Sequence, residues 1–253
     1  MQDKVAIVTG ASSGIGRATA ILLAQSGATV VAVGRNEKEL AATAKAANGS
    51  AGAIKVHLGD VMELSQLDRI VTDTVDQHKR IDVLVNSAGI IKNGNIENTT
   101  LDDWDKMMHI NVRSVFHLVQ KCVPYLEETK GNIVNVSSVT GTRAFPNVLA
   151  YCVSKAAVDQ LTRCTALELA PKGVRINAVN PGVVVTNLHK RGGMEEQAYA
   201  TFLENAKNTH PIGRPGTPEE VAELICFLAS EKAGWITGAT YAIDGGRSQT
   251  CAR

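Results

Sequence analysis

The chain has 253 residues, 44% of them hydrophobic, and its 26 Lys plus Arg nearly balance 25 Asp plus Glu. A length near 250 residues suits a single α/β domain, and a net charge of +1 argues against a nucleic-acid or membrane-surface protein. No stretch approaches the ~18 apolar residues of a membrane span, and the five scattered cysteines show no metal-ligand spacing. We therefore expect a cytoplasmic protein with reduced thiols and no bound metal, nucleic acid or membrane.

Short β-branched runs alternate with helical patterns almost to the end of the chain. Strands are expected at 4–9, 29–33, 53–58, 82–86, 131–137, 174–180 and 240–244, and helices at 14–26, 36–47, 63–79, 101–128, 149–170 and 217–230. Strands that are apolar on both faces and separated by helices predict a parallel sheet covered on both sides. Right-handed crossovers then give a doubly wound, seven-stranded α/β sheet in one domain, residues 1–253.

The first expected strand runs into "TGASSGIG" and then a helix. Gly10 allows a sharp turn out of the strand, Gly14 leaves room for a pyrophosphate, and Gly16 lets the helix pack on the sheet. Ser12 and Ser13 add hydroxyl donors, and the helix N-terminus favours anions. Strand, loop and helix in this order predict a dinucleotide site rather than an empty turn, and the missing Walker lysine disfavours an NTPase.

The residue that ends the second strand distinguishes NAD from NADP. An acid there binds the ribose hydroxyls of NAD, whereas an arginine pairs with the 2′-phosphate of NADP. Here the strand ends in Gly34-Arg35, and the nearest acid, Glu37, falls in the next expected helix. The sequence therefore favours NADPH/NADP+ over NADH/NAD+, although an arginine at a helix start is also commonly just solvated.

Two side chains four residues apart, Tyr151 and Lys155, share one face of the expected helix 149–170. An ammonium beside a phenol stabilises the phenolate, so we expect Lys155 to lower the Tyr151 pKa, as a general acid/base requires. Ser138 ends the fifth strand at the carboxyl edge, where its hydroxyl can reach a substrate oxygen. Asn111 is a poor helix former inside the expected helix 101–128, which indicates a functional reason.

Residues 186–213 interrupt the strand–helix alternation with a polar, helix-capable insertion after a strand end. This position suits a lid over a site, and it suits a surface helix pair equally well. The substrate pocket is expected among residues 90–98, 139–148 and 183–210. Its expected apolar wall comprises Ile90, Val139, Phe145, Val148, Met194 and Phe202, with Arg143 and His189 as polar groups. Such a pocket suits a ketone, quinone, steroid or acyl chain.

Seven features occur together in a characteristic order and spacing: "TGASSGIG", "NSAG" at 86–89, Asn111, Ser138, "YCVSK", "NPGVVVT" at 180–186 and "IDGG" at 243–246. From residue 3 to about 247 the chain resembles the short-chain dehydrogenases/reductases, in their compact branch of about 250 residues. The resemblance implies a Rossmann-type fold and an oxidoreductase of the EC 1.1.1 type. One position departs from the pattern: Ser87 replaces the asparagine of the usual "NNAG".

The resemblance implies a role for each catalytic position. Tyr151 would transfer the proton, Lys155 would lower its pKa and hold the nicotinamide ribose, Ser138 would orient the carbonyl, and Asn111 would hold a water that continues a proton relay. Asp60 would contact the adenine, and the 181–186 turn would surround the carboxamide. The full set of implied cofactor contacts is Gly10, Ser12, Ser13, Gly14, Ile15, Gly16, Arg35, Asp60, Val61, Asn86, Ala88, Gly89, Tyr151, Lys155, Pro181, Gly182, Val184 and Thr186.

The implied reaction moves a hydride between NADP(H) and a carbonyl or secondary alcohol on a small-molecule substrate. Two alternatives stay open: an NAD-linked alcohol or steroid dehydrogenase, and a non-catalytic protein that senses the cofactor. The resemblance also implies a homotetramer that uses helices 101–128 and 149–170 and the 217–247 region. Val115, Leu118, Val119, Leu161 and Leu167 could serve that interface or face their own sheet.

Overall fold

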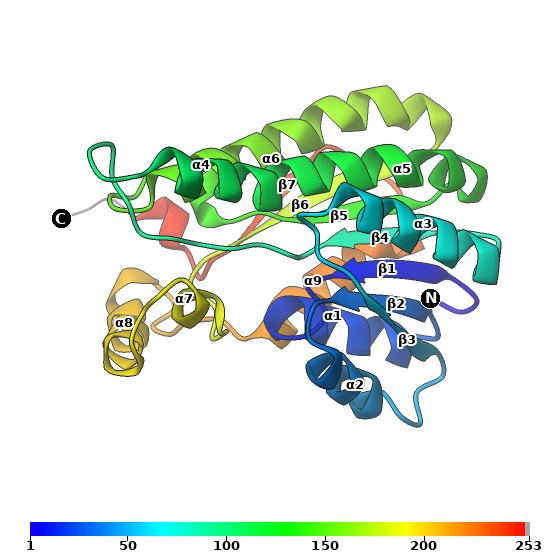
Figure 1. Ribbon diagram of the computed structural model, residues 1–253, viewed down its shortest axis with the longest axis horizontal. Helices are drawn as coiled ribbons and strands as arrows, with labels where there is room; N and C mark the ends of the chain where they lie inside the picture. The colour runs from blue at the N-terminus through cyan, green and yellow to red at the C-terminus, as the bar shows by residue number, and fades with distance from the viewer. Residues whose placement is uncertain (251–253) are drawn as a thin grey trace.

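The computed structural model describes residues 1–250, which build on one seven-stranded sheet, all of its strands parallel. The strand order is β3-β2-β1-β4-β5-β6-β7, which confirms the doubly wound Rossmann-type expectation (Figure 1). The strands are β1 Val5–Thr9, β2 Thr29–Gly34, β3 Ala53–Leu58, β4 Val83–Asn86, β5 Asn132–Val136, β6 Arg175–Pro181 and β7 Thr240–Ile243. Because the strands run in the same direction, the loops after them share one edge of the sheet.

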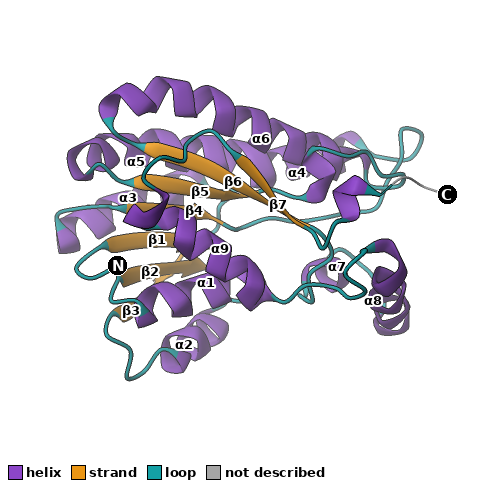
Figure 2. Ribbon diagram, turned by 180° about the vertical axis from the view of Figure 1, so that it is seen from behind, coloured by secondary structure: helices purple, strands orange, loops and turns teal. Residues whose placement is uncertain are grey.

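Helices cover both faces of this sheet, as Figures 1 and 2 show. One face carries α1 Gly14–Gln25, α2 Glu37–Ala46 and α9 Pro218–Ala229, and the other carries α3 Leu64–His78, α5 Ser114–Thr129 and α6 Leu149–Leu169. Two buried clusters fill the layers, represented by Leu23 and Ile225 on the first face and by Leu118 and Leu126 on the second. Within residues 1–250 no helix is both long and apolar enough to cross a membrane.

The expected helix 101–128 is divided into three parts. Helix α4, Leu101–Met108, passes into a π-helical turn, His109–Arg113, before α5 begins at Ser114. A π-turn inserts one residue into the helical ladder and is most often found at functional sites. Asn111 lies in the middle of this turn and is buried, so its poor helix propensity coincides with a local break in the α-helix.

The insertion after β6 forms two helices, α7 Leu188–Arg191 and α8 Glu196–Thr209. In Figures 1 and 2 they stand away from the sheet, on the side of its carboxyl edge. Tyr199 joins α8 to the loop before α7, because its hydroxyl donates to the Thr186 carbonyl at 2.8 Å and accepts from the Thr186 N–H at 3.1 Å. The insertion is therefore anchored at the end of β6.

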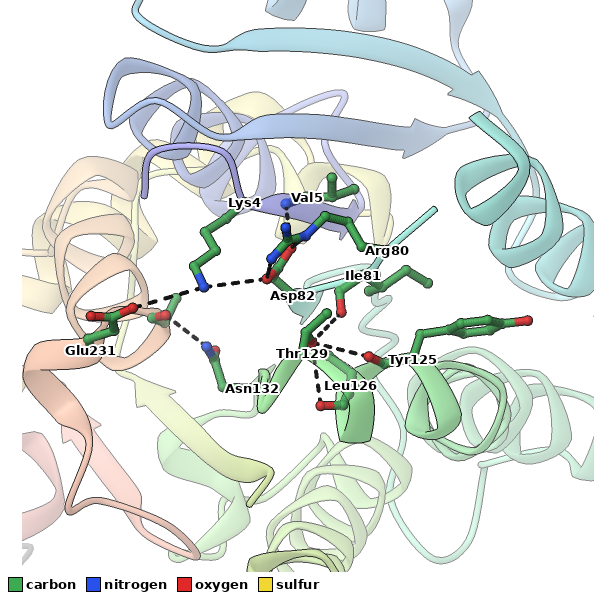
Figure 3. Close-up of polar contacts among 11 residues, drawn as sticks. Lys4, Val5, Arg80, Ile81, Asp82, Tyr125, Leu126, Thr129, Asn132 and Glu231 are labelled. Carbon is green, nitrogen blue, oxygen red and sulfur yellow. Dashed lines mark hydrogen bonds and ion pairs between the residues drawn. The ribbon is translucent and has the colours of Figure 1, made fainter. Parts of the chain in front are cut away.

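A buried carboxylate fixes the opposite, amino edge of the sheet (Figure 3). Asp82, just before β4, accepts the Val5 N–H at 2.9 Å and two bonds from the Arg80 guanidinium at 2.8 and 2.7 Å. Its side chain is 3% exposed, and Lys4 approaches it to 3.5 Å. These contacts tie the start of β1 to the start of β4.

Candidate active site

A cavity of about 1010 Å³ opens at the carboxyl edge, between the loops that follow β1 to β6 and the α7 segment. Its walls include the glycine loop 10–16, residues 87–92, the segment 136–140 and the turn 181–184. The volume lies at the upper end of small-molecule sites, which allows room for a dinucleotide and a second ligand. This is the position at which open α/β sheets bind their ligands.

The glycine loop has a shape that side chains would prevent. Gly10 and Gly14 have φ of +69° and +54°, a region that residues with a Cβ adopt rarely. A Cβ on Gly16 would lie 2.5 Å from the Gly10 carbonyl oxygen, and one on Gly14 would lie 3.0 Å from the Thr186 side chain. The loop therefore passes closely between β1 and the end of β6, and the N-terminus of α1 is left for an anion such as a pyrophosphate.

Tyr151, Lys155 and Ser138 all line this cavity. The first two lie one turn apart near the start of α6, and the Lys155 Nζ is 5.6 Å from the centre of the Tyr151 ring. Lys155 donates to the Val136 carbonyl at 2.8 Å, just before Ser138. The spacing of four on α6 and the end of β5 thus bring the three side chains together as expected.

The pKa values in this cluster are set mainly by burial. Burial raises the pKa of Tyr151 to about 12, and the interaction with the Ser138 side chain lowers it only partly. Burial lowers the pKa of Lys155 to about 8, against an opposing contribution from the Asp159 carboxylate. Desolvation of the phenolate therefore dominates the pKa of Tyr151 in this structure, and the expected lowering of that pKa by Lys155 remains a prediction.

Asn111 is held against the cavity wall rather than exposed in it. Its Oδ1 accepts the Ile90 N–H at 2.9 Å, and its Nδ2 donates to the Ile90 carbonyl and to Ser154 Oγ, both at 3.0 Å. A Cβ on Gly89 would lie 3.3 Å from Asn111 Oδ1 and 3.7 Å from Lys155 Nζ. Asn111 therefore shapes the wall beside Lys155, and its role in holding a water remains a prediction.

Asn86 is the one expected cofactor contact that the structure places outside the cavity lining. It ends β4, is 3% exposed, and pairs in register with Asn135 on β5, to whose Oδ1 it donates at 2.9 Å. The neighbouring Ser87 lines the cavity instead, and its N–H donates to Thr9 Oγ1 at 3.1 Å. The side chain of Asn86 therefore links two strands, and its expected contact with the cofactor remains a prediction.

The end of β2 presents an arginine to the cavity. Arg35 is 67% exposed, and its Nη1 is 3.4 Å from Asp60 Oδ2 in the loop after β3. Asn36 caps α2 by accepting the Glu39 N–H at 3.1 Å, while the Glu39 carboxylate pairs with Arg17 on α1. The end of β2 itself therefore carries no acidic residue, and the carboxylate that pairs with Arg35 comes from the loop after β3.

Most residues of the expected substrate pocket line the same cavity. Ile90, Val139, Phe145, Val148, His189 and Phe202 all line the cavity. Met194 and Arg143 are outside its lining; Arg143 instead donates to the Ser248 and Thr250 carbonyls at 2.7 and 3.1 Å. Besides Arg35, two further arginines line the cavity: Arg191 from α7 and Arg247 from the turn after β7.

Sequence reasoning also missed a buried polar network beneath Ser138. Asn180 Nδ2 donates to the Ser138 carbonyl at 2.9 Å and to Asp159 Oδ2 at 2.8 Å. Burial raises the pKa of Asp159, which is 1% exposed. One sequence signal was present: Asp159 lies four residues after Lys155, on the same face of the helix. The network fixes the backbone that presents the Ser138 hydroxyl.

Known proteins resemble this chain over nearly its whole length. A family model described as enoyl-(acyl carrier protein) reductase matches residues 10–248. The 3-oxoacyl-[acyl-carrier-protein] reductase FabG of Thermotoga maritima is 40% identical, over 97% of this chain and 98% of its own. A 3beta-hydroxysteroid dehydrogenase of Mediterraneibacter gnavus is 37% identical, over 96% and 94%.

Solved structures show the same likeness. A short-chain dehydrogenase/reductase of unknown function from Caenorhabditis elegans, crystallised with cofactor, aligns with a TM-score of 0.94 at 38% identity, covering 99% of this chain and 97% of its own. Levodione reductase aligns with a TM-score of 0.92 at 33% identity, covering 99% and 100%. The chain therefore belongs to the short-chain dehydrogenase/reductase family of oxidoreductases, which bind a nicotinamide cofactor.

Proposed function

We propose that this protein transfers a hydride between NADP(H) and a small-molecule carbonyl or secondary alcohol, as an enzyme of the EC 1.1.1 type in the cytoplasm. One observation carries the proposal: Ser138, Tyr151 and Lys155 line the same cavity as the glycine loop. A proton donor, a hydroxyl and an ammonium thus adjoin a surface shaped for a dinucleotide. The cofactor supplies the hydride when bound, and the protein aligns the reactants.

The protein side of this reaction is proton transfer and orientation. The Tyr151 hydroxyl, protonated because burial raises its pKa, donates to the carbonyl oxygen in reduction, while the Ser138 hydroxyl orients that oxygen. Lys155, whose pKa of about 8 lies near neutral pH, supplies positive charge beside the phenol as the proton leaves. The glycine loop, the 87–89 segment and the 181–186 turn hold the dinucleotide.

The NADP preference rests on Arg35, which faces the cavity at the end of β2. Titration of the purified protein with NADPH and NADH, followed by cofactor fluorescence, should show tighter NADPH binding. Arg35→Ala should weaken NADPH binding about 10-fold or more, by loss of a charge-assisted pair with the 2′-phosphate, and change NADH binding less than about 2-fold. Equal losses for both cofactors would reject the 2′-phosphate role and favour the NAD-linked alternative. One relative, 36% identical, is an NAD-dependent glycerol dehydrogenase of Listeria innocua.

The non-catalytic alternative is tested by turnover. A broad panel of ketones and aldehydes, assayed with the preferred cofactor, should contain at least one substrate. Tight cofactor binding without turnover of any panel member would favour a sensing role. The set Asn111, Ser138, Tyr151 and Lys155 is present in full, which supports the catalytic proposal.

We also propose one domain over residues 1–253, with 186–213 as a lid, and a homotetramer in solution. Of the apolar candidates for the interface, Val115, Leu118 and Val119 are buried against their own sheet, whereas Leu167 is 80% exposed. Trp235 is fully exposed and Phe227 is 42% exposed. These side chains support association through the region around α6 and α9, which light scattering after gel filtration would test by molar mass.

A further inference from the structure

Arg247 places a guanidinium in the cavity from the turn that follows the last strand. Its guanidinium carbon lies 4.8 Å from the centre of the Phe145 ring, and Phe145 belongs to the loop that joins Ser138 to Tyr151. His189 packs on Phe202 with ring centres 4.5 Å apart, and both rings line the same cavity. These four residues, Phe145, His189, Phe202 and Arg247, are called the aromatic pocket below.

The aromatic pocket is distinct from the part of the cavity that suits the cofactor's adenosine. Arg35 follows β2 and Asp60 follows β3, at one end of the strand order, whereas Arg247 follows β7 at the other end. The catalytic Ser138 follows β5, between the two. A ligand group bound by Arg247 would therefore lie on the opposite side of Ser138 from the adenosine, where the substrate belongs.

The Arg247 guanidinium has no protein partner within residues 1–250. No carboxylate of this range lies within 4.0 Å of it, and no hydrogen bond from its side chain is found there. The nearest candidate, Asp244, already accepts the Gly246 and Ser248 N–H groups at 2.9 and 2.7 Å. By contrast, Arg35 pairs with Asp60 and Lys92 pairs with Asp103. A partly buried guanidinium at a cavity wall, with no partner among residues 1–250, is available to an anionic ligand.

The protonation states of Arg247 and His189 bear on which anion the aromatic pocket would bind. Burial lowers the pKa of Arg247, but a guanidinium stays protonated in proteins at neutral pH. Burial, together with the Arg247 charge, lowers the pKa of His189, so that ring is neutral at pH 7. Arg247 places one guanidinium beside this neutral imidazole, and one guanidinium matches one carboxylate in a bidentate pair. The Arg247 guanidinium lies over the Phe145 ring, and a guanidinium can pair with a carboxylate through two parallel N–H bonds.

We propose that Arg247 binds a carboxylate of the substrate, so that the substrate is an oxo acid in reduction or a hydroxy acid in oxidation. This proposal rests on the hydride transfer proposed above. The carbonyl would meet Ser138 and Tyr151, and the carboxylate would pair with Arg247 in the aromatic pocket. Arg247 is then a specificity-determining residue.

Equilibrium binding tests the charge preference directly. Calorimetric titrations of the protein saturated with NADP+ would use 4-oxopentanoate, 6-oxoheptanoate and 4-acetylbenzoate, each compared with its methyl ester, together with 4-acetylphenyl phosphate. These acids span several separations between carbonyl and carboxylate. At least one acid should bind about 10-fold or more tightly than its ester, the range expected for a hydrogen-bonded charge pair, and more tightly than the phosphate.

Three variants separate the pocket charge from general effects. Arg247→Gln should reduce the preference for acid over ester to less than about 2-fold, while Arg247→Lys should keep part of it. Arg69→Gln is the matched control, because Arg69 lies on α3, is 76% exposed and is outside the cavity lining; it should leave the preference unchanged. Ester binding should be similar in all four proteins, which would show that the pocket remains folded.

The proposal is overturned if the wild type binds acids no more tightly than esters, if the preference survives Arg247→Gln, or if the phosphate binds more tightly than every acid. Initial rates of NADPH oxidation provide a second readout, in which Arg247→Gln should raise KM for the acid with little change for the ester. Failure to reduce any panel ketone would reject the proposed hydride transfer, whereas the binding preference would still decide the role of Arg247.

Discussion

The surroundings of Tyr151 keep its phenol protonated. Its phenol is 7% exposed, which raises its pKa to about 12 and keeps it protonated at neutral pH. The Lys155 ammonium lies over its ring, 5.6 Å from the ring centre, and Ser138 provides the polar neighbour. A proton donor in reduction should hold its proton until negative charge develops on the substrate oxygen, and the burial of Tyr151 meets this requirement.

Replacing Tyr151 by phenylalanine removes one oxygen and keeps the ring. We expect kcat to fall by about 10²–10⁴-fold, the usual contribution of a general acid, while the Kd for NADPH changes less than about 2-fold. Steady-state rates and cofactor fluorescence measure the two quantities. Retention of more than about a tenth of the wild-type kcat would remove Tyr151 from the proton-transfer role.

For single residues, the sequence predicts positions whose role depends on local spacing. It does not predict positions whose role depends on neighbours far along the chain. The glycine loop and the Tyr151–Lys155 pair are local patterns, and both occur in the cavity. The pairing of the Asn86 side chain with Asn135, in contrast, depends on the register of β4 with β5. Arg247 comes from a turn far along the chain from Ser138, so only the strand order brings the two to one cavity.

Among the elements, the strands were predicted best, because most of them are short β-branched runs bounded by turns. Their observed limits differ from the expected ones by at most one residue at either end. The long helix was predicted less well. Its apolar periodicity continues through the π-turn 109–113, so no pattern of hydrophobic residues marked the break, and Asn111 alone signalled it.

The ion pair at the amino edge makes a prediction about how β1 and β4 are held together. Asp82→Ala should lower the free energy of unfolding by about 2–3 kcal/mol, because it leaves the Val5 N–H without its acceptor and Arg80 without its carboxylate. Urea unfolding monitored by circular dichroism measures the loss. Cofactor affinity should not change, because Asp82 lies at the edge of the sheet opposite the cavity.

A nearby exposed acid provides the control for this variant. Asp76 lies on α3 and is solvent-exposed, so Asp76→Ala should change the free energy of unfolding by less than about 0.5 kcal/mol. A similarly small change for Asp82→Ala would contradict the role given to the buried carboxylate.

At the scale of the whole molecule, His210 joins the end of α8 to the cavity floor. Its Nε2 accepts the Val183 N–H at 3.0 Å, and its Nδ1 donates to the Ala206 carbonyl at 2.8 Å. This pattern requires the neutral ring, and a Cβ on Gly182 would lie 2.7 Å from Nε2. Burial lowers the His210 pKa, as does the charge of Arg247, while Asp244 and the bond to Ala206 act in the opposite direction.

The lowered pKa predicts a loss of stability in acid. Between the native and unfolded pKa values of His210 the unfolded chain binds more protons, so the free energy of unfolding rises with pH in this window and levels off above about pH 6.5. Between pH 7.5 and 5.5 the wild type should therefore lose more stability than His210→Gln, by at most about 1.4 kcal/mol per pH unit. Urea unfolding at both pH values measures this difference, and equal losses in the two proteins would reject the role of His210.

The contact between α7 and the glycine loop has a consequence for the order of events in turnover. Arg191 Nη1 donates to Ser13 Oγ at 3.0 Å, so the short helix bridges the cavity from the end of β6 to the loop after β1. We expect a dinucleotide seated on that loop to leave only after this hydrogen bond opens, and a smaller product to leave without that step. On this basis the steady-state kinetics should be ordered, with the nucleotide binding first and leaving last. The opening of the short helix α7 should then limit the rate at which the spent nucleotide is exchanged for a new one.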